Sequence, residues 1–217
     1  MSPHQDTDRL AAASLAAGDP TGWFDKLYAE AQQGTAEVPW DRPEPSALLA
    51  DWARAEQPDG TGRRALVVGC GLGRDAEFVA GFGFATTAFD ISETAVRVAR
   101  ARHAGSPVDY RVADLLALPP DWRGAFDLVV ECNNVQALPR SLRARASRAV
   151  TSLVAPGGTL LVIAAAATAW GAEGPPWPLT REEVDGFAVD GVGQVSVEEI
   201  AAADDPLVVR WRAVFRR

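Results

Sequence analysis

Three alternating glycines stand where an apolar run ends and a helical pattern begins, in the segment 67–75, VVGCGLGRD. Glycine lets the backbone turn sharply and lets a ligand approach without meeting a Cβ atom. The helix that follows offers unpaired N–H groups to an anion. The pattern favours a nucleotide or nucleoside lying over the carboxyl edge of a sheet. The alternative is a plain strand-to-helix turn, and the G-x-G-x-G spacing differs from the G-x-G-x-x-G of dinucleotide-binding folds.

Two carboxylates end the next two apolar runs. Asp90 follows Gly69 by about 20 residues, where a carboxylate can accept hydrogen bonds from both hydroxyls of a ribose. Asp114 ends the third run, where it or the neighbouring backbone could meet the exocyclic amine of a base. Each has an alternative, because Asp90 could cap the following helix and Asp114 could be a turn residue. Three consecutive strand ends of the types that adenosine needs favour the nucleoside hypothesis.

The fourth apolar run is followed by a polar cluster that contains Glu131, Asn133 and Asn134. Glu131 is the candidate general base, and its alternative is a structural carboxylate that accepts hydrogen bonds from nearby backbone amides. Neither histidine is well placed to act as a base, since His4 lies in the N-terminal segment and His103 ends a helix. With no well-placed histidine base, this site would favour a reacting group that ionises easily, such as a thiol, over an oxygen or nitrogen with a high pKa.

Tryptophans outside the periodic segments suggest a pocket wall. Trp40, Trp170 and Trp177 stand next to proline or glycine and show no periodicity. Aromatic side chains in such loops often line a site for an apolar substrate, and the face of an indole ring also suits a cation. Cys70 lies inside the glycine segment without a nearby His or Lys in the sequence to lower its pKa, so we interpret it as a packing residue.

The elements that would position these groups alternate along the chain. Expected strands cover 65–68, 84–89, 108–112, 126–132, 159–166, 193–200 and 207–215. Expected helices cover 10–17, 20–34, 75–80, 93–104, 141–154 and 180–187, with another beginning after Ser46. The alternation predicts right-handed crossovers and a mainly parallel sheet, which is covered on both faces because its strands are almost wholly apolar. The period of two in 207–215 predicts an antiparallel strand at or near an edge.

Length and composition fit one globular domain, with 217 residues of which 47% are hydrophobic and 23% charged. We divide it into an N-terminal helical cover, 1–60, and a core, 61–217. The net charge of −8 argues against a nucleic-acid partner. Two cysteines without CxxC spacing predict neither a disulfide framework nor a metal site, and the polar N-terminus predicts a cytoplasmic protein. The longest apolar stretch, 160–170, is about half as long as a membrane span, so no membrane partner is expected.

Taken together, the sequence resembles the class I S-adenosylmethionine-dependent methyltransferases. The residues that carry the resemblance are VGCGLG at 68–73, FDIS at 89–92, AD at 113–114, FDLV at 126–129 and PGG at 156–158. The resemblance implies a Rossmann-like methyltransferase fold, a single-domain α/β structure with a doubly wound, mostly parallel seven-stranded sheet and an antiparallel last strand. It also implies S-adenosylmethionine as cofactor, with S-adenosylhomocysteine as product. The methionine end would lie at 69–73, the ribose at Asp90 and the adenine near Asp114 and Leu115.

Shorter blocks, 23–28 with 38–41 and the loop 174–180, resemble the thiopurine, thiol and halide methyltransferases. In those enzymes an N-terminal tryptophan segment closes over the cofactor, which implies that role for Trp40 and Trp23, and Arg143 matches a substrate-side or cofactor-side arginine. The residues expected at the cofactor are Trp23, Trp40, Gly69, Cys70, Gly71, Gly73, Asp90, Ile91, Asp114, Leu115 and Glu131. The candidate catalytic residues are Glu131, Asn133 and Arg143, and the expected substrate pocket contains Trp40, Asn134, Trp170 and Trp177.

The predicted function is S-adenosylmethionine-dependent methyl transfer to a small molecule, with a thiol or other soft nucleophile as acceptor. The alternatives are O- or N-methylation of a small aromatic metabolite and non-catalytic binding of S-adenosylmethionine. A nicotinamide-dependent oxidoreductase is disfavoured by the glycine spacing and by the absence of a Tyr-x-x-x-Lys pair, since the only lysine is Lys26. The sequence predicts no oligomeric state.

Overall fold

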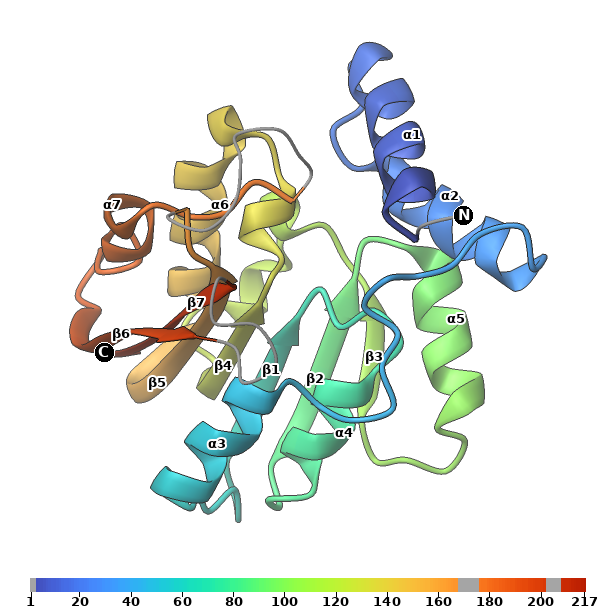
Figure 1. The fold of residues 1–217 in the computed structure, drawn as a ribbon. Coiled ribbons are helices and arrows are strands. Elements are labelled where there is room, and N and C mark those ends of the chain that lie inside the picture. The colour runs from blue at the N-terminus through green and yellow to red at the C-terminus, as the bar shows by residue number, and fades with distance from the viewer. Residues whose placement is uncertain (1–2, 168–175, 202–207) are drawn as a thin grey trace.

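The computed structural model describes residues 3–167, 176–201 and 208–217 (Figure 1). The strands are β1 Arg64–Val68, β2 Ala85–Asp90, β3 Asp109–Val112, β4 Phe126–Cys132, β5 Val154–Ala165, β6 Gly193–Ala201 and β7 Val209–Arg216. The α-helices are α1 Pro3–Ala16, α2 Gly22–Gln32, α3 Ala47–Glu56, α4 Arg74–Ala80, α5 Glu93–Arg102, α6 Arg140–Ser152 and α7 Arg181–Asp185. Three short 3₁₀ helices are η1 Leu115–Ala117, η2 Pro120–Trp122 and η3 Val135–Ala137.

The strands form one seven-stranded sheet in the order β3-β2-β1-β4-β5-β7-β6. The neighbouring strands β3, β2, β1, β4 and β5 all run parallel to one another. In contrast, β7 runs antiparallel to both β5 and β6. This confirms the expected doubly wound α/β sheet with an antiparallel last strand. The edge position belongs to β6, so β7 lies one strand inside the sheet.

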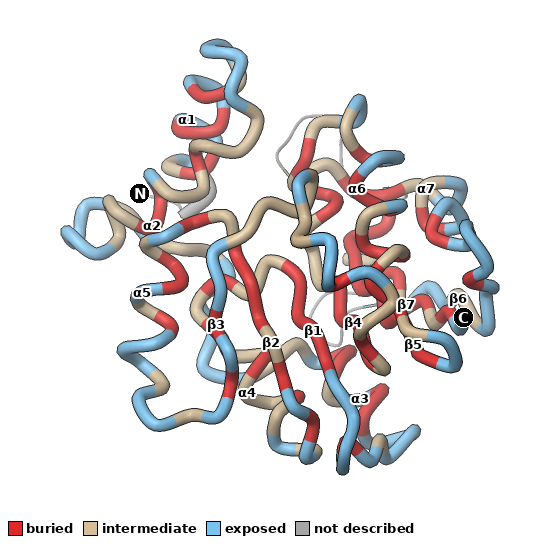
Figure 2. The backbone as a smooth tube through the Cα atoms, turned by 180° about the vertical axis from the view of Figure 1, so that it is seen from behind, coloured by how far each residue is buried: buried red, intermediate tan, exposed pale blue. Residues whose placement is uncertain are grey.

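Apolar side chains on both faces of the sheet build the core. In β1, Leu66 and Val68 face one cluster, with α6, and Ala65 and Val67 face the other, with α3, α4 and α5. Because successive side chains of a strand point to opposite faces, a strand buried on both faces is apolar throughout. Figure 2 shows the central strands buried and the outer helix faces exposed. The near-continuous apolar runs in the sequence have this physical origin.

The first 60 residues divide into two parts rather than one cover. The helices α1 and α2 pack together through Leu10, Trp23 and Leu27, beyond the carboxyl edge of the sheet and above α5 (Figure 1). Helix α3 instead joins the core on one face of the sheet, where Leu49 and Trp52 are buried. We therefore use the term cover for α1, α2 and the segment 33–45.

Side chains and turns at the ends of several elements make contacts of their own. Before α2, whose N-cap residue is Thr21, the Asp19 Oδ1 accepts hydrogen bonds from the N–H groups of Thr21 and Gly22. Ser46 is the N-cap residue of α3, yet within the described chain its side chain makes no capping bond. The PGG segment at 156–158 lies inside β5, which begins five residues before the strand expected from 159, and the register against β4 shifts there.

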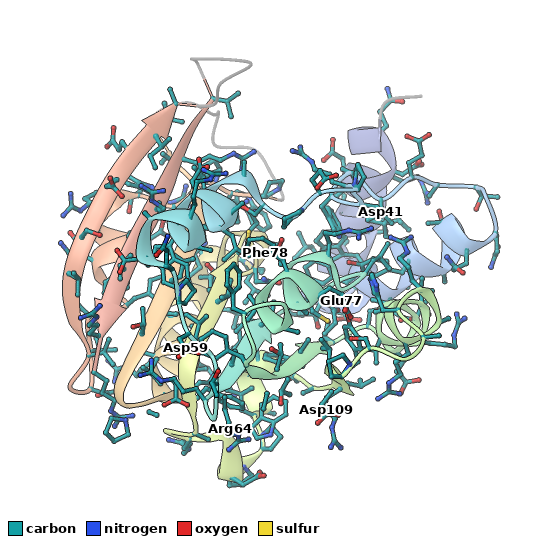
Figure 3. All side chains as sticks on the ribbon, turned by 90° about the horizontal axis from the view of Figure 1, so that it is seen from below. Asp41, Asp59, Arg64, Glu77, Phe78 and Asp109 are labelled. Carbon is teal, nitrogen blue, oxygen red and sulfur yellow. The ribbon has the colours of Figure 1, made fainter. Side chains whose placement is uncertain are left out.

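At the amino edge of the sheet, Arg64 of β1 contacts two residues of β4. The guanidinium of Arg64 lies 4.7 Å from the centre of the Phe126 ring, and the Arg64 N–H donates to Asp127 Oδ2 over 2.8 Å. Figure 3 shows Arg64 and Asp59 near one another and Asp41, which belongs to the cover, apart from both. The polar residues singled out in the sequence lie at the carboxyl edge. In the part of the chain that the structure describes, no helix is long and apolar enough to cross a membrane.

Candidate cofactor and acceptor site

The glycine loop follows β1 and leads directly into α4. Gly69, Gly71 and Gly73 all have positive φ, at 54°, 51° and 91°, a region that other residues rarely adopt. A Cβ atom would lie 1.6 Å from Asn134 Oδ1 at Gly69 and 2.8 Å from the Tyr28 hydroxyl at Gly71. Glycine is therefore required by backbone conformation and by the close approach of protein side chains.

Asp90 ends β2 beside this loop and is 7% exposed. Its Oδ2 accepts a hydrogen bond from Gly71 N over 2.9 Å, and its Oδ1 accepts one from Ser92 N over 2.9 Å. Burial raises the pKa of Asp90, although the backbone N–H donors act in the opposite direction. A carboxylate has about four acceptor sites, so these two bonds leave acceptor capacity for hydroxyl groups. Ile91 and Ser92 carry the chain from Asp90 into α5.

Asp114 lies at the end of β3, next to Asp90. The Ala113 N–H donates to Asp90 O over 3.0 Å, which joins the ends of the two strands. Asp114 is the N-cap residue of η1, and its Oδ1 accepts from Leu116 N over 2.8 Å. Leu115 is partly buried against the core. The structure thus brings the glycine loop, Asp90 and the Asp114–Leu115 segment to one edge.

The cover lies against the glycine loop through Tyr28 and Trp40. Trp40 Nε1 donates to the Tyr28 hydroxyl over 2.7 Å, and the Trp23 ring meets the Trp40 ring edge to face, with centres 6.2 Å apart. Trp23 is buried in the cover, whereas Trp40 is 40% exposed. Arg102 of α5 holds the segment that follows, since its guanidinium donates two hydrogen bonds to Asp41, over 2.6 and 3.0 Å.

At the end of β4, Glu131 organises the backbone of the next turn. Its Oε1 accepts from Asn134 N over 2.7 Å and from Val135 N over 2.9 Å, and Glu131 is fully buried. Among the described residues, Oε2 has no hydrogen-bond partner. Burial raises the pKa of Glu131 from 4.5 to about 7. The two hydrogen bonds fit a structural role, in which Glu131 accepts from backbone amides. The raised pKa is also suited to proton transfer near neutral pH.

The two asparagines after β4 have different surroundings. Asn134 Nδ2 donates to Val68 O over 2.7 Å and to Cys132 O over 3.0 Å, so the side chain joins the ends of β1 and β4 above Gly69. Asn133 has a positive φ of 62°, and in the described structure its buried Oδ1 lacks a partner. Asn133 is therefore a strained polar residue at this edge, as active-site residues often are.

The buried thiol of Cys70 lies in the glycine loop. Burial, together with the charge of Asp90, raises the pKa of Cys70 well above its ordinary value. The thiol therefore stays protonated at neutral pH, which is the opposite of an activated nucleophile. This agrees with the interpretation of Cys70 as a packing residue.

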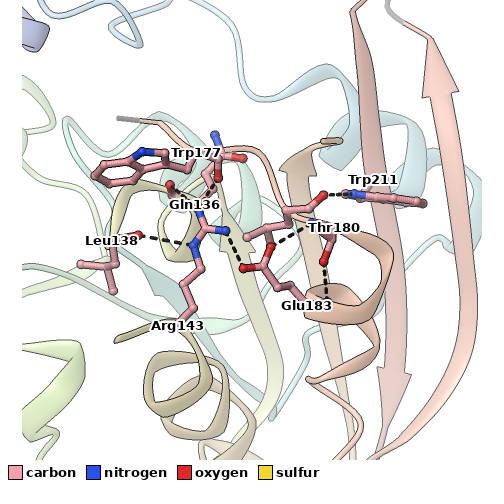
Figure 4. Close-up of polar contacts among 8 residues, drawn as sticks. Gln136, Leu138, Arg143, Trp177, Thr180, Glu183 and Trp211 are labelled. Atoms are coloured by element: carbon pink, nitrogen blue, oxygen red, sulfur yellow. Dashed lines mark hydrogen bonds and ion pairs between the residues drawn. The ribbon is translucent and has the colours of Figure 1, made fainter. Parts of the chain in front are cut away.

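Arg143 lies on α6 and ties the chain around Trp177 to the turn after β4 (Figure 4). Its guanidinium pairs with Glu183 over 2.6 Å and donates to the carbonyl oxygens of Leu138, Gln136 and Trp177. The described partners of Arg143 are thus protein groups on η3, on its C-cap residue, on α7 and in the segment that leads into α7. Trp177 N also donates to Gln136 O over 2.9 Å. Trp170, the remaining expected pocket residue, lies outside the described residues.

The sequence analysis missed two residues that contact the site, Tyr28 and Asp25. The apolar periodicity of 20–34 predicted a buried face for Tyr28 but gave no sign that its hydroxyl would meet Gly71. Asp25 accepts hydrogen bonds from Ser92 and Thr94, 67 and 69 residues away, and no local pattern marks such a contact. In the described ranges, no group of three or more His, Cys, Asp or Glu side chains could hold a metal ion.

This fold is the Rossmann-like methyltransferase fold, and residues 65–158 match the family described as "Methyltransferase domain". A ubiquinone biosynthesis O-methyltransferase of Xanthomonas campestris pv. campestris is 39% identical over 103 residues, which cover 46% of this chain and 42% of the relative. A protein of the same name from Azotobacter vinelandii is 34% identical over 128 residues, with 55% and 54% covered. The chain spans about half the length of these curated relatives or less.

Solved structures share the fold across most of the chain at low sequence identity. A structure from a study of the conversion of a disulfide bond into a thioacetal group during echinomycin biosynthesis has a TM-score of 0.71 at 23% identity, covering 89% of this chain and 91% of that one. The 1,6-didemethyltoxoflavin-N1-methyltransferase of Burkholderia thailandensis, with bound S-adenosylhomocysteine, has a TM-score of 0.69 at 15% identity, covering 97% and 90%. These likenesses cover more of the chain than the matched family region, 65–158.

Proposed function

We propose that this chain is an S-adenosylmethionine-dependent methyltransferase that acts on a small molecule. The observation that carries the proposal is the meeting of three strand ends, with the glycine loop after β1, Asp90 after β2 and Asp114 after β3. This edge lies within the region that matches the methyltransferase domain. A glycine loop that carries no Cβ atoms at three positions, a carboxylate with free acceptor capacity and a partly apolar turn fit the methionine, ribose and adenine parts of the cofactor.

In the proposed site, the chain contributes binding and water exclusion. The cofactor supplies an electrophilic methyl group on its sulfonium. Asp90 would accept hydrogen bonds from the ribose hydroxyls, and the backbone of 69–73 would face the methionine end. Trp40 and Tyr28 would exclude water above the loop, which matters because in-line displacement depends on orientation and desolvation. Trp177 and Asn134 would border the acceptor.

We infer that the acceptor ionises without a protein base, and that it is a thiol. The support is that Glu131, the carboxylate at the end of β4, is fully buried and already accepts two backbone hydrogen bonds. His103 is the C-cap residue of α5, and its Nε2 already contacts the Leu72 carbonyl oxygen at 3.1 Å. A thiol with an ordinary pKa near 8.5 is a few per cent ionised at neutral pH and needs little help.

O-methylation is the second candidate, because the curated relatives are named ubiquinone biosynthesis O-methyltransferases. The matched family region ends at residue 158, before the segment that contains Trp177, and the fold itself hosts different acceptors. The acceptor chemistry therefore has to be measured.

A matched panel of acceptors tests both candidates. Purified protein is given S-adenosylmethionine with thiophenol, phenol, catechol or aniline, and S-adenosylhomocysteine release is measured against a reaction without protein. We expect the largest protein-dependent release with thiophenol, and methyl phenyl sulfide as its product. Release with catechol and none with thiophenol would establish O-methylation instead. Tight cofactor binding without release for any acceptor would favour a non-catalytic binding protein.

A further inference from the structure

Helix α2 contacts both of the residues that support Asp90. The Asp25 Oδ1 accepts hydrogen bonds from Ser92 Oγ over 2.6 Å and from Thr94 N over 3.0 Å. Tyr28 lies three residues later, hence on the same side of α2, with its hydroxyl against Gly71. Ser92 and Gly71 are the residues whose N–H groups donate to the Asp90 carboxylate. One helix of the cover thus reaches both supports of the proposed ribose-binding group.

The contact at Ser92 is well defined. Ser92 is fully buried, and its Oγ donates to Asp25 while accepting from Ala95 N over 3.0 Å. Burial alone would raise the pKa of Asp25, but the hydrogen bonds from Ser92 and Thr94 outweigh it, and the pKa of Asp25 is lowered. Asp25 is therefore charged at neutral pH. A negative charge at the N-terminus of α5 is favourable, because the N–H groups there carry partial positive charge.

Two grooves lie beside α2, next to the contacts between the cover and the core. A groove of about 340 Å³ is lined in part by Tyr28 and Leu72, and another of about 400 Å³ in part by Asp25 and Thr94. Apolar packing therefore leaves open space beside α2 on the core. The hydrogen bonds of Asp25 join α2 to the N-terminal end of α5.

We propose that Asp25 is a positioning residue for cofactor binding, which holds α2 against Ser92 and Gly71 and so fixes the carboxylate of Asp90. The inference rests on the proposed function, in that Asp90 binds the cofactor ribose. Occupancy of the ribose site and docking of the cover would then be coupled. By thermodynamic linkage, cofactor binding must strengthen docking of the cover by the same factor by which docking strengthens binding.

Titration calorimetry with S-adenosylhomocysteine tests the proposal. Asp25→Asn keeps an acceptor oxygen and removes the charge, so we expect its Kd to rise about 3-fold, whereas Asp25→Ala removes both and should raise Kd about 10-fold or more. Glu30→Gln is the matched control. Glu30 lies on the same helix and pairs with Arg9 of α1, so its ion pair stays within the cover and its Kd should match wild type.

Amide hydrogen exchange provides a readout that a purely structural role would leave unchanged. In wild type, S-adenosylhomocysteine should slow exchange in α1 and α2, and this slowing should be lost in Asp25→Ala. If Asp25→Ala lowers the melting temperature while its Kd and its ligand-induced protection equal those of wild type, the proposal is wrong. If Asp25→Ala does not fold, Asp25→Asn decides by the same criteria. Failure of wild type itself to bind S-adenosylhomocysteine is a separate result and would overturn the proposed function.

Discussion

Arg143 of α6 and Glu183 of α7 form a 2.6 Å ion pair in which only 3% of the arginine side chain is exposed. Glu183 also completes a capping box, since its carboxylate accepts from Thr180 N and Thr180 Oγ1 accepts from Glu183 N. A buried charge needs several partners to offset its loss of water, and Arg143 has them in the ion pair and three carbonyl oxygens. The pair fixes the segment that carries Trp177.

Replacement of Arg143 should therefore affect stability strongly. Arg143→Met removes the partner of a partly buried carboxylate, and we expect the free energy of unfolding to fall by about 3 kcal/mol. Arg148→Met on the exposed face of the same helix should change it by less than about 0.5 kcal/mol. Urea denaturation measures both. A loss below about 1 kcal/mol in Arg143→Met would show that the network contributes little to stability.

Glu131 should make stability depend on pH. Its folded pKa of about 7 exceeds the unfolded value of 4.5, so the stability linked to its protonated form is fully present below pH 4.5 and is lost as the pH rises to about 7. The unfolding free energy of wild type minus that of Glu131→Gln should fall by about 3 kcal/mol over this window. A difference that stays constant between pH 4.5 and pH 8 would contradict the raised pKa.

The strands and the glycine loop were predictable because their signals are local. Residues 65–68 form a run that is apolar along its whole length, and the alternating glycines directly after it mark the end of the strand. Asp90 and Asp114 follow from their places at successive strand ends. Each of these inferences needs only neighbouring residues and the general geometry of parallel sheets.

The polar contacts between distant segments could not be predicted in this way. Nothing near Arg143 indicates that Glu183, 40 residues later, would pair with it, since most arginines are exposed. The same holds for Asp25 with Ser92 and for Asn134 with the carbonyl of Val68. Such contacts depend on which helices the completed fold brings together. The glycine loop, Asp90 and Asp114 could be expected at one edge of the sheet, because strand order alone brings them there. The roles of single polar residues such as Glu131 stay proposals.

Trp40 and Tyr28 should contribute to cofactor affinity as a pair. Trp40→Phe keeps an aromatic ring but removes the N–H that donates to the Tyr28 hydroxyl, and we expect Kd for S-adenosylhomocysteine to rise about 2- to 10-fold. Trp40→Ala should weaken binding further, because it also exposes the glycine loop. Tyr28→Phe checks the pair from the other side, and its effect combined with Trp40→Phe should be smaller than the sum of the two. Fully additive effects would show that the two side chains act independently.

Titration of S-adenosylhomocysteine into wild type and into Asp90→Ala tests the central claim most directly, with Asp90→Asn as the isosteric companion and thermal unfolding as the check on folding. The account predicts one binding site per chain in wild type. It predicts about 100-fold weaker binding in Asp90→Ala, because two hydrogen bonds from ribose hydroxyls to a buried carboxylate are lost. Equal affinity in the folded variant, or no binding by wild type, would contradict the assignment of this edge of the sheet as a methyl-donor site.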